Sequence, residues 1–274
     1  MGRKAVVDLL KGYYADFKRY LPLLFTLTSR DIKLKYRRSV LGIMWSILNP
    51  LIIMIVMTQV FTYLLRVPPP DVPFAVFYIV GATLFNFFSE ATNTSMSSVI
   101  GNSALIKKVY IPKYIFPLEK CLFSLVNMLF SMIAVIIVMS FYVITGEVVL
   151  TWKIFLFFIP MGFCFLFTVG MSMILSSLTV YFRDILHLWG VILTIWMYLT
   201  PIIYGVNIIE GTPLMWVDRC NPLYYFTTAM RDVLIYGVFP SAANIIISAI
   251  CCLVTLIAGG LVFKKAQDRF ILHI

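Results

Sequence analysis

Two basic segments of the sequence hold the side chains best suited to binding chemistry. In the first, near the amino terminus, bulky side chains recur at the spacing of one helix face and cations occupy the opposite side. The face residues are Tyr20, Leu23, Leu24, Leu27, Leu34 and Leu41, and the basic residues are Arg30, Lys33, Lys35, Arg37 and Arg38. Pro22 suits the first turn of such a helix, and its amphipathic pattern predicts that it lies along the inner membrane surface. A membrane anchor and a role in gating or substrate reception both fit this pattern.

The second basic segment, residues 101–117, combines lysines with large apolar side chains. A loop that is merely solvated has no use for Leu105, Ile106, Val109 and Tyr110. A short helix that docks into a partner protein would use them. The composition predicts such a docking helix, with a solvated loop as the alternative.

The elements that position these segments follow from composition. The chain has 274 residues, of which 61% are hydrophobic and 12% charged, against about 45–50% and about 25% in soluble domains. This excludes a soluble enzyme and a disordered chain. Apolar runs longer than about 18 residues indicate bilayer spans. We expect an all-α membrane protein with a cytoplasmic arm, residues 1–42, and a six-span domain, residues 43–274. The predicted spans are 43–65, 74–100, 117–145, 154–181, 186–204 and 244–263.

The distribution of charge predicts the topology. Eighteen Lys and Arg residues fall on the side of the termini and only four on the other side. Cytoplasmic loops carry such an excess, so both termini are expected in the cytoplasm. The net charge of +10 therefore needs no nucleic-acid partner.

The outer segment 211–240 fits neither a span nor a solvated loop. It contains three prolines and a high density of aromatic residues. Re-entrant or interfacial helices, with aromatic rings at the level of the lipid headgroups, fit best.

Few residues could perform chemistry at membrane depth. Glu90 is a functional candidate by default, unless span two ends earlier and leaves it at the inner interface. Arg183 and Asp184 could pair and fix the start of span five. Aromatic residues in spans one and five could line a path for a glycan, although packing and lipid contact are the favoured explanation for each residue taken singly. They are Phe61, Tyr63, Trp189, Trp196 and Tyr204.

Several motifs are absent from the sequence. It has no G-x-x-x-x-G-K-[ST] phosphate loop, no H-E-x-x-H and no G-x-S-x-G. The five cysteines show no C-x-x-C spacing, and with two histidines a metal site is not expected. We therefore expect a conduit without catalytic residues or a cofactor of its own, driven by energy from elsewhere.

Four motifs in order resemble the membrane subunit of type-2 ABC exporters, in the polysaccharide and polyol-phosphate branch. Residues 29–45, SRDIKLKYRRSVLGIMW, are similar to the family signature R-D-[IL]-K-x-R-Y-[RK]-x-S-x-L-G-x-x-W, with Lys35 where arginine is common. Residues 102–112, NSALIKKVYIP, are similar to the family's inner loop. The pairs Arg183-Asp184 and Asn221-Pro222 also agree with the family pattern.

The resemblance implies an exporter of two copies of this chain and two copies of a separate ATPase that binds ATP and Mg. It implies a channel between the two copies, lined by spans one and five and closed on the outside by the re-entrant helices. Lipid-linked O-antigen, capsule or teichoic-acid chains would be the substrates, in the cytoplasmic membrane of a bacterium. Export of a small molecule or drug is the alternative, and a lipid-processing membrane enzyme is a distant one.

The resemblance also assigns roles to residues. The coupling helix that seats in the ATPase would use Asn102, Leu105, Ile106, Lys107, Lys108, Val109, Tyr110 and Pro112. The amino-terminal helix would gate the entrance and receive the anionic lipid head. Its residues for that role would be Arg30, Asp31, Lys33, Arg37 and Arg38.

Overall fold

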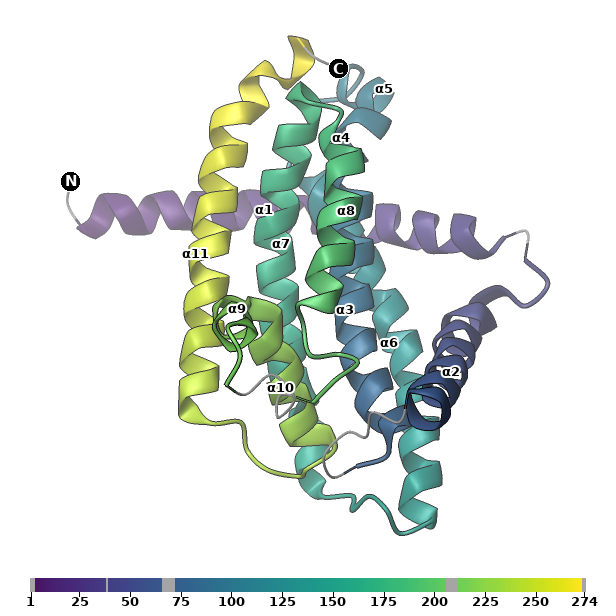
Figure 1. Ribbon diagram of the computed structural model, residues 1–274. Helices are drawn as coiled ribbons and strands as arrows, with labels where there is room; N and C mark the ends of the chain where they lie inside the picture. The colour runs from purple at the N-terminus through teal and green to yellow at the C-terminus, as the bar shows by residue number, and fades with distance from the viewer. Residues whose placement is uncertain (1–2, 38, 66–71, 206–210, 273–274) are drawn as a thin grey trace.

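The computed structural model describes residues 3–37, 39–65, 72–205 and 211–272, which form helices and connecting turns but no strand (Figure 1). Five helical stretches are long and apolar enough to cross a membrane. They are Gly42–Leu64, Phe74–Met96, Ile115–Ile144, Trp152–Tyr181 and Ala242–Phe270. The all-α class is confirmed, and each of the five stretches overlaps one of the six predicted spans as a candidate.

The remaining prediction, a span over 186–204, is not confirmed as one continuous helix. Helix α8, Ile185–Tyr198, has 14 residues, which rise about 21 Å at 1.5 Å each. That is less than the roughly 30 Å of a hydrocarbon core. Pro201 lacks a backbone N–H and cannot continue the helix, so residues 199–205 follow as turns.

Helix α1, Arg3–Tyr36, runs crosswise to the long helices (Figure 1). Pro22 lies inside this helix, so the prediction that Pro22 opens it is wrong. The side of α1 that faces the bundle begins with the buried Leu24 and Leu27. These residues pack against Ile115 and Phe116 of α6, Ile115–Ile144.

Beyond residue 27 the predicted leucine face does not pack against the bundle. Leu34 and Leu41 are exposed. The inner side of α1 continues instead with Asp31 and Lys35, which pair with residues of other helices. Charged pairs therefore replace apolar contacts along the last turns of α1.

The other elements are short helices or complete the long stretches. They are η1 Gly42–Met44, α2 Trp45–Thr58, η2 Gln59–Leu64, α4 Ser98–Gly101, α5 Ser103–Ile106, η3 Trp152–Phe157, α7 Phe158–Tyr181, α9 Leu214–Cys220, α10 Pro222–Leu234, α11 Ala242–Ala266 and η5 Gln267–Leu272. Helices α9 and α10 lie toward the opposite end of the bundle from α4, α5 and the carboxyl terminus (Figure 1).

Helix α3, Phe74–Met96, forms the centre of the bundle. It packs against α2, α6, α7, α8 and α10, and 83% of its apolar window is buried. Its Phe88 ring meets Phe167, Trp189 and Trp196 at centroid distances of 5.7, 6.3 and 5.3 Å. This aromatic cluster joins α3 to α7 and α8 and fixes the position of α8.

Helices α7 and α11 approach closely at two glycines. A Cβ added at Gly259 would lie 2.4 Å from the Gly170 carbonyl oxygen, and one added at Gly170 would lie 2.5 Å from the Thr255 backbone. Small residues allow helix backbones this close in membranes, where van der Waals packing drives association.

Candidate functional site

The loop predicted to dock a partner divides into a half-buried and an exposed part. Leu105 and Ile106 of α5 pack against the apolar cluster that Leu24, Ile111 and Phe116 form with neighbouring residues. They therefore attach the loop to the bundle and are less available to a partner than the exposed residues that follow them. The Asn102 side chain donates a hydrogen bond to the Ser98 carbonyl at 2.8 Å, and Pro112 is half-buried.

The exposed part is the tip that follows α5. Tyr110 is 92% exposed and Val109 is 51% exposed, and Lys107 and Lys108 are also exposed. A tyrosine and a valine presented to solvent beside cations make a surface suited to a protein partner. We call residues 107–110 the loop tip.

The outer side of α1 carries the predicted reception residues. Arg30, Lys33 and Arg37 line an open cavity together with Phe25 and Leu34. Arg38 lies outside the described residues. Cations beside apolar side chains on a membrane-surface helix can hold an anionic lipid head.

Asp31 faces α6 rather than this cavity. Its carboxylate accepts hydrogen bonds from Lys120 and, at 2.8 Å, from Arg30 Nε. Lys120 lies 3.3 Å from the buried Glu119 as well. Burial alone would raise the pKa of Asp31, but the hydrogen bonds and charges of Lys120 and Arg30 hold that pKa below its usual value.

Glu90 lies in a polar network that the sequence did not predict. Its Oε1 accepts from Lys35 Nζ at 2.8 Å and from Asn127 Nδ2 at 3.0 Å. Tyr36 donates to Asn127 Oδ1 at 3.1 Å and shares a short hydrogen bond with Ser46. The network joins α1, α2, α3 and α6, so Lys35 ties α1 to the bundle centre.

Pro50 creates a second polar link to α2. A proline has no N–H, so the Ser46 carbonyl four residues earlier loses its helical partner. Ser131 Oγ of α6 donates to that carbonyl at 3.0 Å. Both links position α2 against α6.

The broken end of α8 is held by Arg231 of α10, a residue that sequence reasoning counted only as an outer charge. Its side chain is 4% exposed and donates to the carbonyls of Pro201 at 2.6 Å, Phe77 at 3.2 Å and Ile202 at 3.3 Å. The guanidinium lies 3.4 Å from the centroid of the Phe77 ring. Burial lowers the pKa of Arg231 to about 9. The available signal was an arginine 30 residues after the helix-breaking Pro201.

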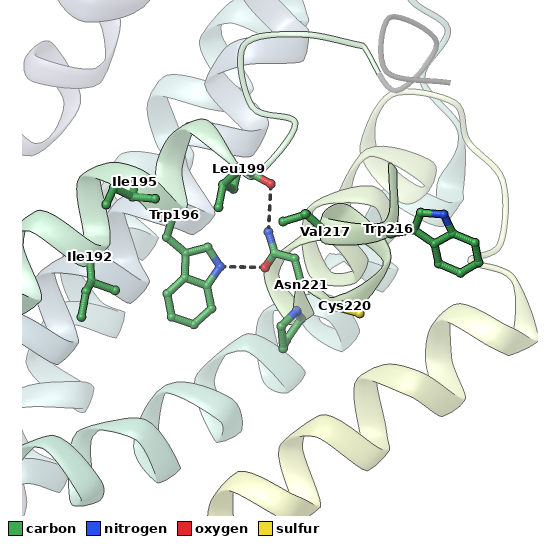
Figure 2. A pocket seen from close by; sticks show the side chains of 9 residues that line it. Ile192, Ile195, Trp196, Leu199, Trp216, Val217, Cys220 and Asn221 are labelled. Atoms are coloured by element: carbon green, nitrogen blue, oxygen red, sulfur yellow. Dashed lines mark hydrogen bonds between the residues drawn. The ribbon is translucent and has the colours of Figure 1, made fainter. Parts of the chain in front are cut away.

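Asn221 makes a second connection between α8 and the outer helices (Figure 2). Its Oδ1 accepts from Trp196 Nε1 at 2.8 Å and from the Leu223 N–H at 3.0 Å. Its amide donates to Thr200 Oγ1 at 2.8 Å and to the Leu199 carbonyl at 3.3 Å. The motif Asn221-Pro222 therefore joins the start of α10 to the end of α8.

An apolar cavity of about 590 Å³ lies beside Asn221, between α8 and α9 (Figure 2). Its walls include Ile192, Ile195 and Trp216. In the outer helices α9 and α10, burial raises the pKa values of Asp218 and Asp232 to about 6.

The five predicted channel aromatics lie in different environments. Trp189 is buried and donates to Thr92 at 3.0 Å, and Phe61 stacks on Phe74 at 5.3 Å. Tyr204 donates to the Tyr198 carbonyl at 3.1 Å. Tyr63 is exposed, whereas Trp196 is half-buried beside Asn221. The rings of Trp189 and Trp196 contact each other at a centroid distance of 6.1 Å. The channel role of the five residues stays a prediction.

The ion pair predicted between Arg183 and Asp184 does not form. Both side chains are exposed, and no salt bridge joins them in the described part of the chain. Asp184 instead begins α8 through its backbone carbonyl, which accepts from His187 and Leu188. The helix end is therefore fixed by backbone hydrogen bonds.

Comparison with known proteins places the sequence among transport permeases. The O-antigen export system permease protein RfbA of Klebsiella pneumoniae is 28% identical over 94% of this chain and 95% of its own length. The Myxococcus xanthus protein of the same name is 28% identical over 93% and 96%. The polysialic acid transport protein KpsM of Escherichia coli is 22% identical over 88% and 92%.

The family model described as "ABC-2 type transporter" matches residues 22–235. This match begins inside α1 and ends at α10, so it contains the polar network, the loop tip and the Arg231 site. The chain, a multi-pass membrane protein and a transport subunit rather than an enzyme, belongs to the ABC-2 type transporter family.

Proposed function

We propose that this chain is the membrane subunit of an ATP-driven exporter that carries lipid-linked polysaccharide across the bacterial cytoplasmic membrane. The observation that carries the proposal is similarity to O-antigen export permeases over 94% of this chain and 95% of the relative. Similarity to a polysialic acid transport protein supports the same substrate class.

Two copies of the chain would work with two copies of an ABC ATPase. The sequence has no phosphate loop of its own, which supports a separate energy source. The loop tip, residues 107–110, would contact the ATPase because its tyrosine and valine are presented to solvent. Both termini would lie in the cytoplasm, on the same side as the loop tip.

The half-buried part of the loop supports a path for motion. Leu105 and Ile106 contact the cluster that includes Leu24 of α1. A push on the loop tip would therefore reach α1 as well as α3. Movement of α1 would shift Arg30, Lys33 and Arg37, the cations that would hold the pyrophosphate of the substrate, and would open the path between the two copies.

Deletion of the chain in its native bacterium tests the proposed function. We expect loss of the surface polysaccharide and accumulation of lipid-linked glycan inside the cell, both restored by the wild-type chain. Normal surface polysaccharide in the deletion strain contradicts the proposal.

Two substitutions test the division of the loop. We expect Tyr110→Asp to leave the chain folded but to abolish co-purification of the ATPase, whereas Tyr110→Phe keeps the complex. Leu105→Asp places a charge in the cluster against α1 and should lower the stability of the chain itself. An intact complex in Tyr110→Asp contradicts the docking role.

A further inference from the structure

We propose that the half-open polar cavity bordered by α1, α2, α3 and α6 binds a sugar residue of the exported glycan, close to its lipid-linked end. The inference rests on the proposed function and adds a site and a ligand class to it. The cavity measures about 490 Å³, within the range of about 300–1,000 Å³ usual for small-molecule sites.

The charge balance of this cavity favours a neutral ligand. Among the described residues that line it, the one cation, Lys35, is paired with the one carboxylate, Glu90, at 2.8 Å. Asn127 donates to the same carboxylate oxygen. A phosphate would lose its hydration here without meeting an uncompensated cation, whereas the cavity lined by Arg30, Lys33 and Arg37 on α1 suits it better.

Amide groups without protein partners supply the hydrogen-bonding capacity. Asn49 of α2 and Asn86 of α3 line the cavity, and neither side chain bonds to another residue that the structure describes. Each amide offers two donors and one carbonyl acceptor. Sugar hydroxyls both donate and accept, so these amides complement them.

An aromatic ring completes the match to a sugar. Trp45 lines the same cavity and is 48% exposed. An indole ring offers a flat apolar face to the C–H groups of a pyranose, and its N–H remains available as a donor. Amides beside a half-exposed indole favour a hydroxyl-rich ring over a purely apolar compound.

The walls are rigid where the ligand would contact them. Tyr36 bonds to both Ser46 and Asn127, and Ser131 holds the Ser46 carbonyl. These bonds fix α2, which carries Trp45 and Asn49, relative to α6. Pre-arranged polar groups bind at lower entropic cost.

Photocrosslinking in the native cell tests the site directly. A diazirine lysine analogue at position 86 or 49 should, on illumination, attach glycan to the chain and give a ladder of glycan-stained bands. The matched control is position 93, an exposed asparagine on the same helix that does not line the cavity. The ladder should vanish when the first glycosyltransferase of glycan synthesis is deleted. Absence of glycan at both 49 and 86, in cells that export normally, overturns the inference.

Alanine substitution gives an independent measure. Asn49→Ala and Asn86→Ala should each slow the appearance of surface glycan about three- to tenfold, the effect of losing one or two hydrogen bonds. Asn93→Ala should leave the rate within about twofold of wild type, a change no larger than the loss of one weak hydrogen bond would cause. Normal export in the double variant Asn49→Ala, Asn86→Ala overturns the sugar site while the proposed function stands. If deletion of the whole chain leaves surface glycan unchanged, the proposed function fails, and this inference fails with it.

Discussion

Helix α3 is less hydrophobic than α11 but is buried to a much greater extent. Helix α3 has the lowest mean hydropathy of the five long helical stretches, yet 83% of its window is buried, whereas the stretch that contains α11 has the highest and is 17% buried. In water the order would be reversed. Where the solvent is lipid, apolar surface gains nothing by turning inward, and polar groups need protein partners instead.

The two helices are therefore held by different forces. Helix α3 carries hydrogen-bond acceptors for side chains of other helices. Glu90 accepts from Lys35, and the Phe77 carbonyl accepts from Arg231. Helix α11 attaches to α7 through close backbone packing at Gly170 and Gly259. This difference predicts which substitutions each helix tolerates.

The largest effect is expected at the glycine contact. Gly259→Val would place side-chain atoms where the Gly170 carbonyl lies, 2.4 Å from the new Cβ, and should destabilise the chain by about 3 kcal/mol or more. We expect loss of folded protein, measured by size-exclusion chromatography and thermal unfolding in detergent.

The neighbouring glycine provides the matched control. A Cβ at Gly260 meets nothing within 4 Å, so Gly260→Val should leave the unfolding temperature nearly unchanged. If both variants behave alike, the contact between α7 and α11 does not depend on close backbone approach, and the contrast with α3 is lost.

Hydropathy was enough to predict five of the spans, because the bilayer imposes a long apolar helix on any spanning segment. It could not predict which helix lies at the centre. That position depends on which polar side chains meet across helices, as Glu90, Lys35 and Asn127 do, and one sequence does not encode such pairings locally.

The second largest effect is expected at Arg231. This residue tests the other half of the comparison, the attachment of α3 through polar links. Arg231→Met removes hydrogen bonds to three buried carbonyls and should cost about 2–3 kcal/mol. Thermal unfolding should show the loss of stability. In limited proteolysis, the first cleavage should fall within residues 199–205. Arg219→Met is the control, because Arg219 is exposed. Equal stability of the two variants would mean that the end of α8 holds without the guanidinium.

Arg231 and Leu105 mark the limits of sequence reasoning at the candidate site. The family pattern located the loop, but whether Leu105 faces α1 or a partner depends on tertiary contacts. The role of Arg231 depends on Gly81 as well, since a Cβ there would lie 2.7 Å from the guanidinium. Two residues 150 positions apart show no shared pattern in a single sequence.

The smallest effect concerns Asp31, whose pairing with Lys120 attaches α1 at the edge of the bundle. Asp31→Asn should lower stability by about 1 kcal/mol at neutral pH, because Lys120 keeps its contact with Glu119 at 3.3 Å. The folded-state pKa of Asp31 lies below its usual value. The stabilisation is therefore present above the unfolded pKa of about 3.9 and is lost as the pH falls through the folded pKa.

This sign predicts the form of the pH dependence. The difference in unfolding temperature between wild type and Asp31→Asn should stay constant from about pH 8 to 5 and shrink below about pH 4. Asp184→Asn, at an exposed acid without an ion pair in the described residues, should show no such difference at any pH. A difference for Asp31→Asn that persists unchanged at pH 3 would mean that Asp31 stabilises α1 through shape rather than charge. The edge of the bundle would then be held as α11 is, by packing, and polar attachment would be confined to the surroundings of α3.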